Sequence, residues 1–196
     1  TLWQPGKAFC DQFYLSVTGE VQPGKIYPIV LTLYDYDTQQ NLPSTNPDGS
    51  ESNLIGYVRT RSDLTYTSDE IEIARFGGVH LLNEQRTDTA LQLTWGVEHP
   101  PARGLKTFVH IIDANGEIAA QVDVTTGGDN YPAWAWNAGE KILDTILLPL
   151  DQLPAGTYRI LLGVYDPQTM MREAASLPAG TPLTDNALNV GQIEVP

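Results

Sequence analysis

The chain has 196 residues, of which 24 are acidic and 11 are basic, and its formal net charge at pH 7 is -13. This charge opposes binding to nucleic acid or to an anionic membrane surface, because either would repel the protein. The only cysteine is Cys10, which excludes an intrachain disulfide and a thiolate metal cluster. The 14 prolines and 17 glycines are spread along the chain, which favours short strands separated by turns over long helices.

Strand patterns follow one another along most of the chain. Alternation with period two is clearest in ALQLTW at 90–95, where every second residue is apolar. No stretch of about 12 residues combines helical spacing of apolar positions with a credible helix cap. The other predicted strands cover residues 106–113, 117–124, 141–150, 157–166 and 189–195, and residues 69–76 are a weaker candidate.

The sequence DANGE at 113–117 joins two of these strands. Asn115 and Gly116 favour positive φ angles, so we expect a tight hairpin turn here. The alternative is a surface calcium site, because Asp113, Asn115 and Glu117 occupy alternate positions as in a calcium loop. The turn is favoured, since the residues that follow it form a strand and do not continue a calcium loop.

An internal repeat relates the beginning of the chain to its last third. At a spacing of 133 residues the matched pairs are Trp3 with Trp136, Gly6 with Gly139, Asp11 with Asp144 and Leu15 with Leu148. At a spacing of 131 residues they are Tyr27 with Tyr158, Tyr34 with Tyr165, Asp35 with Asp166, Thr38 with Thr169 and Gly49 with Gly180. IGYV at 55–58 also resembles VGQI at 190–193. Because the matches keep their order, we predict two copies of one β unit.

The two copies are unequal. We predict a complete unit at 79–196, a partial copy at 1–61, and a linker or connecting strand at 62–78. The partial copy lacks counterparts of LQLTW, FVHIID and EIAAQVD, so its strand edges and one apolar face would be exposed. Either the missing strands precede Thr1 in a longer protein, or another surface completes the copy. The expected fold is all-β: an antiparallel β-sandwich, immunoglobulin-like or jelly-roll-like, with a partial N-terminal repeat.

The strings LQLTW, TFVHIIDANGEIAAQVD, YPAWAWNAGEKILDTILLPL, LPAGTYRILLGVYDPQT and GQIEV occur in this order in the second copy. In this order they resemble the C-terminal extracytoplasmic β-sandwich of bacterial membrane glycosyltransferases of the dolichyl-phosphate-mannose mannosyltransferase type. The resemblance covers about residues 79–195, and the partial copy resembles only the later half. It implies an extracytoplasmic accessory domain without catalysis of its own. The acidic catalytic motif and membrane helices of those transferases are absent from this sequence.

The stretch TTGGDNYPAWAWNAGE at 125–140 carries the candidate ligand site. Tyr131 and Trp134 could stack on sugar rings while neighbouring polar groups bind hydroxyls. The polar candidates are Asp123, Asp129 and Asn130. The alternative is that the aromatic side chains fill the core. Trp136 fits that alternative because it recurs as Trp3, whereas Trp134 aligns with Thr1 and is not required by the repeat.

Candidate catalytic groups are few. The three histidines share no metal-ligand spacing, and the mid-strand His110 is expected to be a buried or half-buried structural residue. No Gly-x-Ser-x-Gly motif occurs. Asp11 and Asp144 fall one in each copy, so we interpret them as structural residues hydrogen-bonded to backbone. The sequence predicts no enzyme activity and no cofactor.

Two functions are therefore expected. The first is a non-catalytic extracytoplasmic or cell-surface accessory module, part of a larger anchored or secreted protein, that binds a carbohydrate or a glycan-bearing partner. The alternative is an assembly protein whose incomplete first unit pairs with another chain, or with itself, by strand addition. An apolar run of about 18 residues and a signal-peptide pattern are both lacking, so any anchor or signal is expected outside this sequence.

Overall fold

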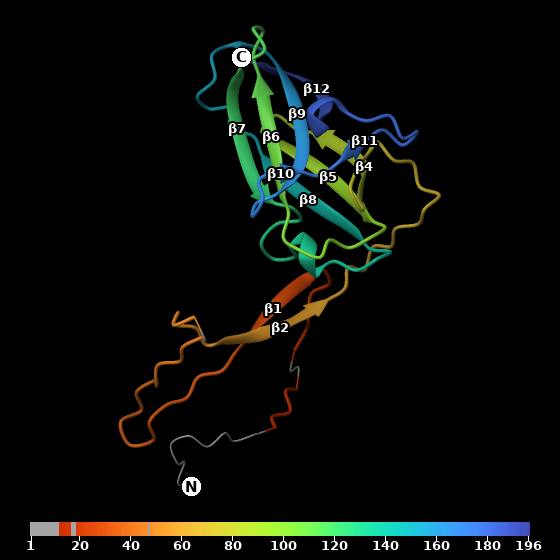
Figure 1. The fold of residues 1–196 in the computed structure, drawn as a ribbon. Helices are drawn as coiled ribbons and strands as arrows, with labels where there is room; N and C mark the ends of the chain where they lie inside the picture. Colours follow the sequence, from red (N-terminus) through yellow and green to blue (C-terminus); the bar gives the residue numbers. More distant parts are fainter. Residues whose placement is uncertain (1–11, 17–18, 47) are drawn as a thin grey trace.

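The computed structural model of the chain describes residues 12–16, 19–46 and 48–196 and is built from antiparallel strands (Figure 1). The strands are β1 (Lys25–Val30), β2 (Leu54–Thr60), β3 (Ala74–Phe76), β4 (Val79–Arg86), β5 (Ala90–Val97), β6 (Lys106–Ile112), β7 (Ile118–Thr125), β8 (Lys141–Leu147), β9 (Gly156–Asp166), β10 (Met171–Arg172), β11 (Ala175–Ser176) and β12 (Leu188–Val195). Two short 3₁₀ turns, η1 (Ala133–Ala135) and η2 (Thr184–Asn186), are the helical elements of the described residues. The all-β prediction is confirmed.

Two five-stranded sheets form a sandwich. In one sheet the order is β10, β9, β6 and β7, with β12 also paired to β9, and in the other it is β11, β3, β4, β5 and β8. Alternating residues of both sheets point inward and form one apolar core. Within it the rings of Phe76 and Trp95 meet edge to face, with centroids 5.9 Å apart. The predicted antiparallel sandwich is thus confirmed.

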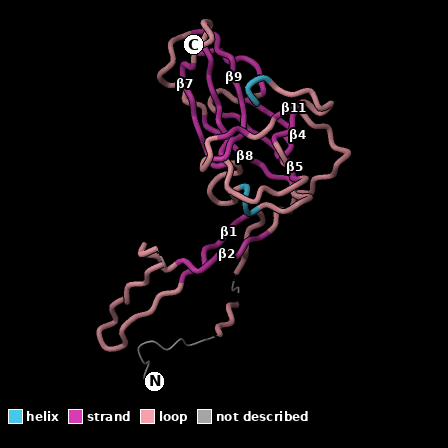
Figure 2. The backbone as a smooth tube through the Cα atoms, in the orientation of Figure 1, coloured by secondary structure: helices cyan, strands magenta, loops and turns pink. Residues whose placement is uncertain are grey.

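The hairpin of β1 and β2 forms a separate two-stranded sheet. Figure 1 shows it projecting from the end of the sandwich at which η1 lies, and Figure 2 shows that the long connection between its strands is almost entirely loop. We call described residues 19–46 and 48–60 the hairpin unit. Trp3, Gly6, Asp11 and Cys10 lie outside the described residues, so that end of the predicted repeat is not placed.

The connection at 62–78 contributes to the sandwich as well as linking the two parts. Its β3 pairs with β4 and β11. The Tyr66 hydroxyl donates a hydrogen bond to Glu72 Oε1 at 3.0 Å, and His80 Nδ1 lies 2.7 Å from the same oxygen. Burial, together with Glu72, raises the pKa of Tyr66 to about 12. These contacts hold the connection against β4, an inner strand of the second sheet.

The turn at 113–117 is a hairpin turn, but Gly116 is its only residue with positive φ, at 91°. Asp113 N–H donates to Glu117 O and Gly116 N–H to Asp113 O, and the register shifts between Ile111 and Ile112. The loop is therefore a longer bulged turn, because only one residue needs the left-handed conformation.

Candidate binding sites

Tyr131 lies in the loop between β7 and β8 and is buried, in contact with protein rather than solvent. Its hydroxyl donates to Glu140 Oε2 at 2.7 Å. Burial first, and then the adjacent carboxylate, raises the pKa of Tyr131. A Cβ added at Gly24 would lie 3.6 Å from the Tyr131 ring, so the chain entering β1 passes close to the ring. The hairpin unit therefore lies against Tyr131.

Trp134 and Trp136 have different surroundings. Trp136 is buried, and its indole N–H donates to Tyr131 O at 2.7 Å. Trp134 is half-buried, and its ring centroid lies 5.3 Å from that of Tyr57 on β2. Asn130 contributes its carbonyl, which accepts from Ile26 N–H at 2.8 Å. Trp134, Tyr131 and Asn130 therefore come together where the hairpin unit meets the sandwich.

Asp129 and Asp123 are exposed and do not join this group through a hydrogen bond in the described part of the chain. Asp123 lies on β7 opposite Phe108, on the outer face of the first sheet. The five predicted ligand residues are thus divided between the junction with the hairpin unit, an exposed loop and a sheet face.

Glu140 is the buried carboxylate that holds the junction together. Its Oε1 accepts from Arg61 Nε at 3.2 Å, from Ser62 N–H at 3.2 Å and from Asn137 Nδ2 at 2.9 Å. Its Oε2 accepts from Asn137 N–H at 2.9 Å in addition to Tyr131. A buried charge is tolerated when its lone pairs are satisfied in this way. Sequence reasoning missed Glu140 because two of its partners, Arg61 and Ser62, are 79 and 78 positions away along the chain.

A depression lies on the outer face of the first sheet, with a volume of about 290 Å³. It is lined by Phe108, His110, Gln121, Asp123, Tyr165, Met170 and Arg172. The Arg172 guanidinium lies 4.4 Å from the centre of the Phe108 ring, a cation-π contact. Burial raises the pKa of Tyr165, and Asp123 adds to this effect. Burial also lowers the pKa of His110, which is half-buried as the sequence predicted.

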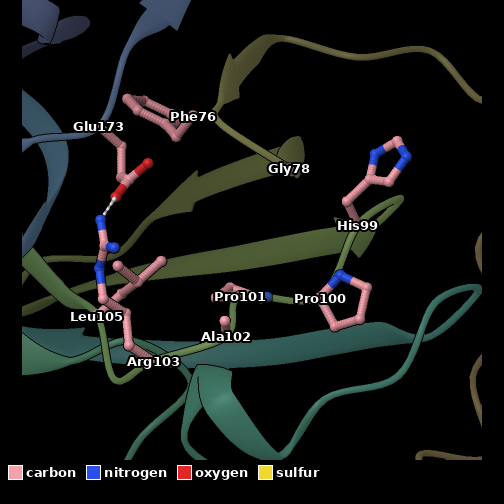
Figure 3. Close-up of a pocket in the computed structure, with 9 residues that line it drawn as sticks. All are labelled: Phe76, Gly78, His99, Pro100, Pro101, Ala102, Arg103, Leu105 and Glu173. Carbon is pink, nitrogen blue, oxygen red and sulfur yellow. Dashed lines mark hydrogen bonds and ion pairs between the residues drawn. The ribbon is translucent and has the colours of Figure 1, made fainter.

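The depression in Figure 3 is held by ion pairs. Arg103 Nε lies 2.8 Å from Asp166 Oδ2, and Arg103 Nη2 lies 3.3 Å from Glu173 Oε1. His99 is exposed, and its ring points away from this pair. Because Arg103, Asp166 and Glu173 pair with one another, we interpret the polar lining of this depression as structural and not as a ligand site.

Asp113, Asn115 and Glu117 form the predicted turn. Asp113 Oδ1 accepts from the backbone N–H of both other residues at 2.9 Å. These turn amides, that of Glu117 first, lower the pKa of Asp113. The carboxylate is therefore used within the turn itself. Among the described residues, no group of three or more His, Cys, Asp or Glu side chains could hold a metal ion.

Asp144 was expected to bind backbone, and its Oδ2 accepts from Gly127 N–H at 2.9 Å. The Trp95 indole N–H donates to the same oxygen at 3.3 Å. Burial nevertheless raises the pKa of Asp144, since the two bonds offset only part of the loss of water.

The chain matches no protein-family model, no curated protein and no solved structure at a significant level. The resemblance to the glycosyltransferase domain therefore stays a prediction. No helix within the described ranges is long and apolar enough to cross a membrane.

Proposed function

We propose that this chain is a non-catalytic accessory and assembly module of an extracytoplasmic protein, and that its hairpin unit docks another chain. The observation that carries the proposal is the exposed apolar face of the hairpin unit. Leu31 is 42% exposed, Leu33 51% and Val58 44%. Tyr27 lies opposite Val58, so their side chains share one face of the hairpin. Because side chains alternate along β1, Ile29 lies on that face too. We call Ile29, Leu31, Leu33 and Val58 the docking face.

An apolar sheet face gains stability when a second layer covers it, because burial removes that surface from water. A two-stranded hairpin without such a layer is marginal in water. Assembly through the docking face would supply this layer. The predicted ligand residues are weaker support for binding a partner or a glycan, because Tyr131 and Trp134 already contact the hairpin unit.

The extracytoplasmic location and the accessory role rest on the resemblance of residues 79–195. The strand order supports the immunoglobulin-like form of the sandwich. With β4, β5 and β8 as strands A, B and E, and β7, β6, β9 and β12 as C′, C, F and G, the order agrees with that topology, except that no described strand takes the place of D beside β8. The Tyr158 hydroxyl donates to Pro154 O at 2.9 Å, which resembles the tyrosine corner of such domains.

Sedimentation velocity over a wide concentration range tests the docking face. We expect the parent protein to form species heavier than the 21.5 kDa monomer as its concentration rises, because in the absence of a partner the docking faces cover one another. The double variant Leu31→Asp, Leu33→Asp should remain monomeric. Leu147→Asp is the matched control, since Leu147 is 71% exposed on β8, outside the docking face. A parent that is monomeric throughout, or a control that dissociates equally, contradicts docking between copies.

Carbohydrate binding is the second candidate, and the depression around Asp123 favours it. The half-buried Tyr165 presents an aromatic ring there, above a floor formed by the buried Phe108, and Asp123, Gln121 and Arg172 supply hydrogen-bonding groups, the combination that sugar sites use. Titration with a panel of glycans should show binding that Asp123→Ala removes. If Trp134→Ala removes binding and Asp123→Ala does not, the ligand lies at the junction. Absence of binding to every glycan by the parent would remove this candidate.

A further inference from the structure

The hairpin of β1 and β2 has the same strand register as the pair β9 and β12. Adding 131 to a residue of β1 and 135 to its partner on β2 gives a pair in the second set. The matches are Lys25:Thr60 with Gly156:Val195, Ile26:Arg59 with Thr157:Glu194, Tyr27:Val58 with Tyr158:Ile193, and Pro28:Tyr57 with Arg159:Gln192. The strands β1 and β2 have one further pair, Ile29:Gly56, and both registers shift before they resume at Val30:Leu54 and Leu161:Asn189.

The turn that follows each of β1 and β9 is also the same. Asp35 accepts from the Thr38 hydroxyl at 2.9 Å, and Asp166 accepts from the Thr169 hydroxyl at 3.0 Å. The next residue has positive φ in both, 58° at Gln39 and 59° at Met170, and its N–H donates to the aspartate carbonyl at 2.8 Å.

Agreement continues beyond the turns. Leu42 N–H donates to Leu33 O, and 131 positions later Glu173 N–H donates to Val164 O, both at 2.8 Å. The isolated bridge between Thr45 and Glu51 has its counterpart at Ser176 and Pro182. Gly49 and Gly180, 131 positions apart, have φ angles of 85° and 86°.

The two hairpins differ in what lies beside them. β9 pairs with β6 along its second edge, with Val109 opposite Leu162 and Ile111 opposite Ile160. Ile160, Leu162 and Ile193 are buried under the facing sheet. Among the described strands β1 pairs only with β2, and the equivalent residues Ile29, Leu31 and Val58 form the partly exposed docking face.

From this we infer that the hairpin unit is the closing part of a second sandwich and accepts a partner β segment with the strand pattern of β6, backed by a layer like β4, β5 and β8. This inference rests on the docking proposed above and names its occupant. By the register of β6 on β9, the partner strand runs antiparallel to residues 28–34, with its Val109 equivalent opposite Leu31 and its Ile111 equivalent opposite Ile29.

Two residues of the free edge restrict the partner strand. Ile26 N–H bonds Asn130 O on the side away from β2, so alternation places the Pro28, Val30 and Thr32 nitrogens on that side too. Pro28 has no N–H to donate. Its counterpart Arg159, however, belongs to the last residue pair between β9 and β6, so the missing N–H falls at the end of the ladder. The ladder therefore ends at Pro28 and relies on the Val30 and Thr32 amides.

Thr32 also determines the residue that can sit opposite it. Its counterpart is Gly163, where an added Cβ would collide with the Phe108 ring. Since Thr32 carries a Cβ and a branched side chain, a phenylalanine opposite it would clash in the same way. The partner strand must have a small residue where β6 has Phe108.

A labelled peptide tests this assignment on the full chain. The probe has the sequence of residues 104–113 with Phe108→Ala, and its binding is followed by fluorescence anisotropy. We expect saturable binding that is about tenfold tighter than that of the same peptide with Phe108 retained, because of the clash with Thr32. Hydrogen exchange of the Val30 and Thr32 amides should slow when the probe binds.

Leu31→Asp should abolish probe binding, whereas Leu147→Asp should leave it unchanged. A probe that carries Ile111→Asp is the matched control on the peptide side. Equal binding of the Phe108→Ala peptide and the peptide that retains Phe108 would overturn the assigned occupant. So would slower hydrogen exchange at the β7 edge in place of the Val30 and Thr32 amides.

The proposed function and its occupant can fail separately. If the parent self-associates through the docking face and binds no probe, docking stands and the β6-like occupant is wrong. If the parent is monomeric and binds the probe at the β1 edge, the partner strand is the occupant and docking between copies is excluded. If it neither self-associates nor binds the probe, both proposals are wrong.

Discussion

The hairpin of β1 and β2 and the pair β9 and β12 share their register and turn hydrogen bonds, yet only the second is covered by other strands. Leu162 is fully buried, and Leu31, at the equivalent position of the pairing, is 42% exposed. Local backbone geometry therefore follows from the turn residues and the strand pattern without a covering layer. The hydrophobic contribution to stability, in contrast, depends on that layer. Two hairpins of equal geometry therefore differ in stability when only one of them is covered.

The largest difference is expected between Leu162→Ala and Leu31→Ala. Leu162→Ala should lower the free energy of unfolding by about 3 kcal/mol, because it removes buried methyl groups and leaves a cavity. Leu31→Ala should cost less than about 1 kcal/mol, since its side chain is already partly hydrated. Urea unfolding followed by tryptophan fluorescence measures both. Equal losses would mean that the docking face is covered in the isolated chain.

The two regions are joined at Glu140, and its removal should be the next largest effect. Glu140→Ala leaves the Tyr131 hydroxyl and two backbone N–H groups without their acceptor. We expect a loss of about 2 to 3 kcal/mol in the free energy of unfolding. Hydrogen exchange at Ser62 should also accelerate as the hairpin unit separates from the sandwich.

Glu117→Ala serves as the control for Glu140, because Glu117 is exposed and its side chain makes no hydrogen bond or ion pair in the described part of the chain. A Glu140→Ala variant as stable as this control would show that the junction does not depend on the buried carboxylate.

Much of this fold could be predicted from the sequence, because alternation and turn residues are local signals. The strands at 90–97, 106–112 and 156–166 fall close to their predicted ranges. The short β3 was only a weak candidate, since its pairing with β4 and β11 is what defines its three residues. In the turn at 113–117, Asn-Gly favoured a two-residue loop, but the register shift at Ile112 accommodates a longer one.

The candidate sites could be predicted only in part. Tyr131 and Trp134 were candidate sugar-stacking rings, with core filling as the alternative, and nothing local indicated that Gly24 and Tyr57 would lie against them. The depression around Asp123 was missed because its members come from four strands. Strand register could have found it, since Phe108 pairs with both Asp123 and Gly163.

Gly180→Ala and Gly49→Ala should separate local strain from global stability. Both glycines have φ near 85°, and an added Cβ at either meets no atom within 4 Å, so the strain is conformational and equal. It should amount to about 1 kcal/mol. Gly180→Ala should lower the free energy of unfolding of the sandwich by this amount, because its loop connects β11 and η2. Gly49→Ala should leave that value unchanged if the uncovered hairpin unit unfolds independently; an equal loss would show that the two regions unfold together.

The smallest effect is expected at the two turn aspartates, in acid. The Thr38 amide holds the pKa of Asp35 below its usual value, and the Gln168 amide does the same for Asp166, which also pairs with Arg103. Since each folded pKa is depressed, the stability that these groups contribute is complete above about pH 4 and is lost as the pH falls through the folded value. Asp166→Asn should therefore flatten the acid limb of a thermal-unfolding profile. Asp35→Asn should change it less, because an uncovered turn adds little to the cooperative unit and no ion pair of Asp35 occurs among the described residues. Equal flattening by both variants would mean that the turn itself, and not its coverage, determines the acid sensitivity.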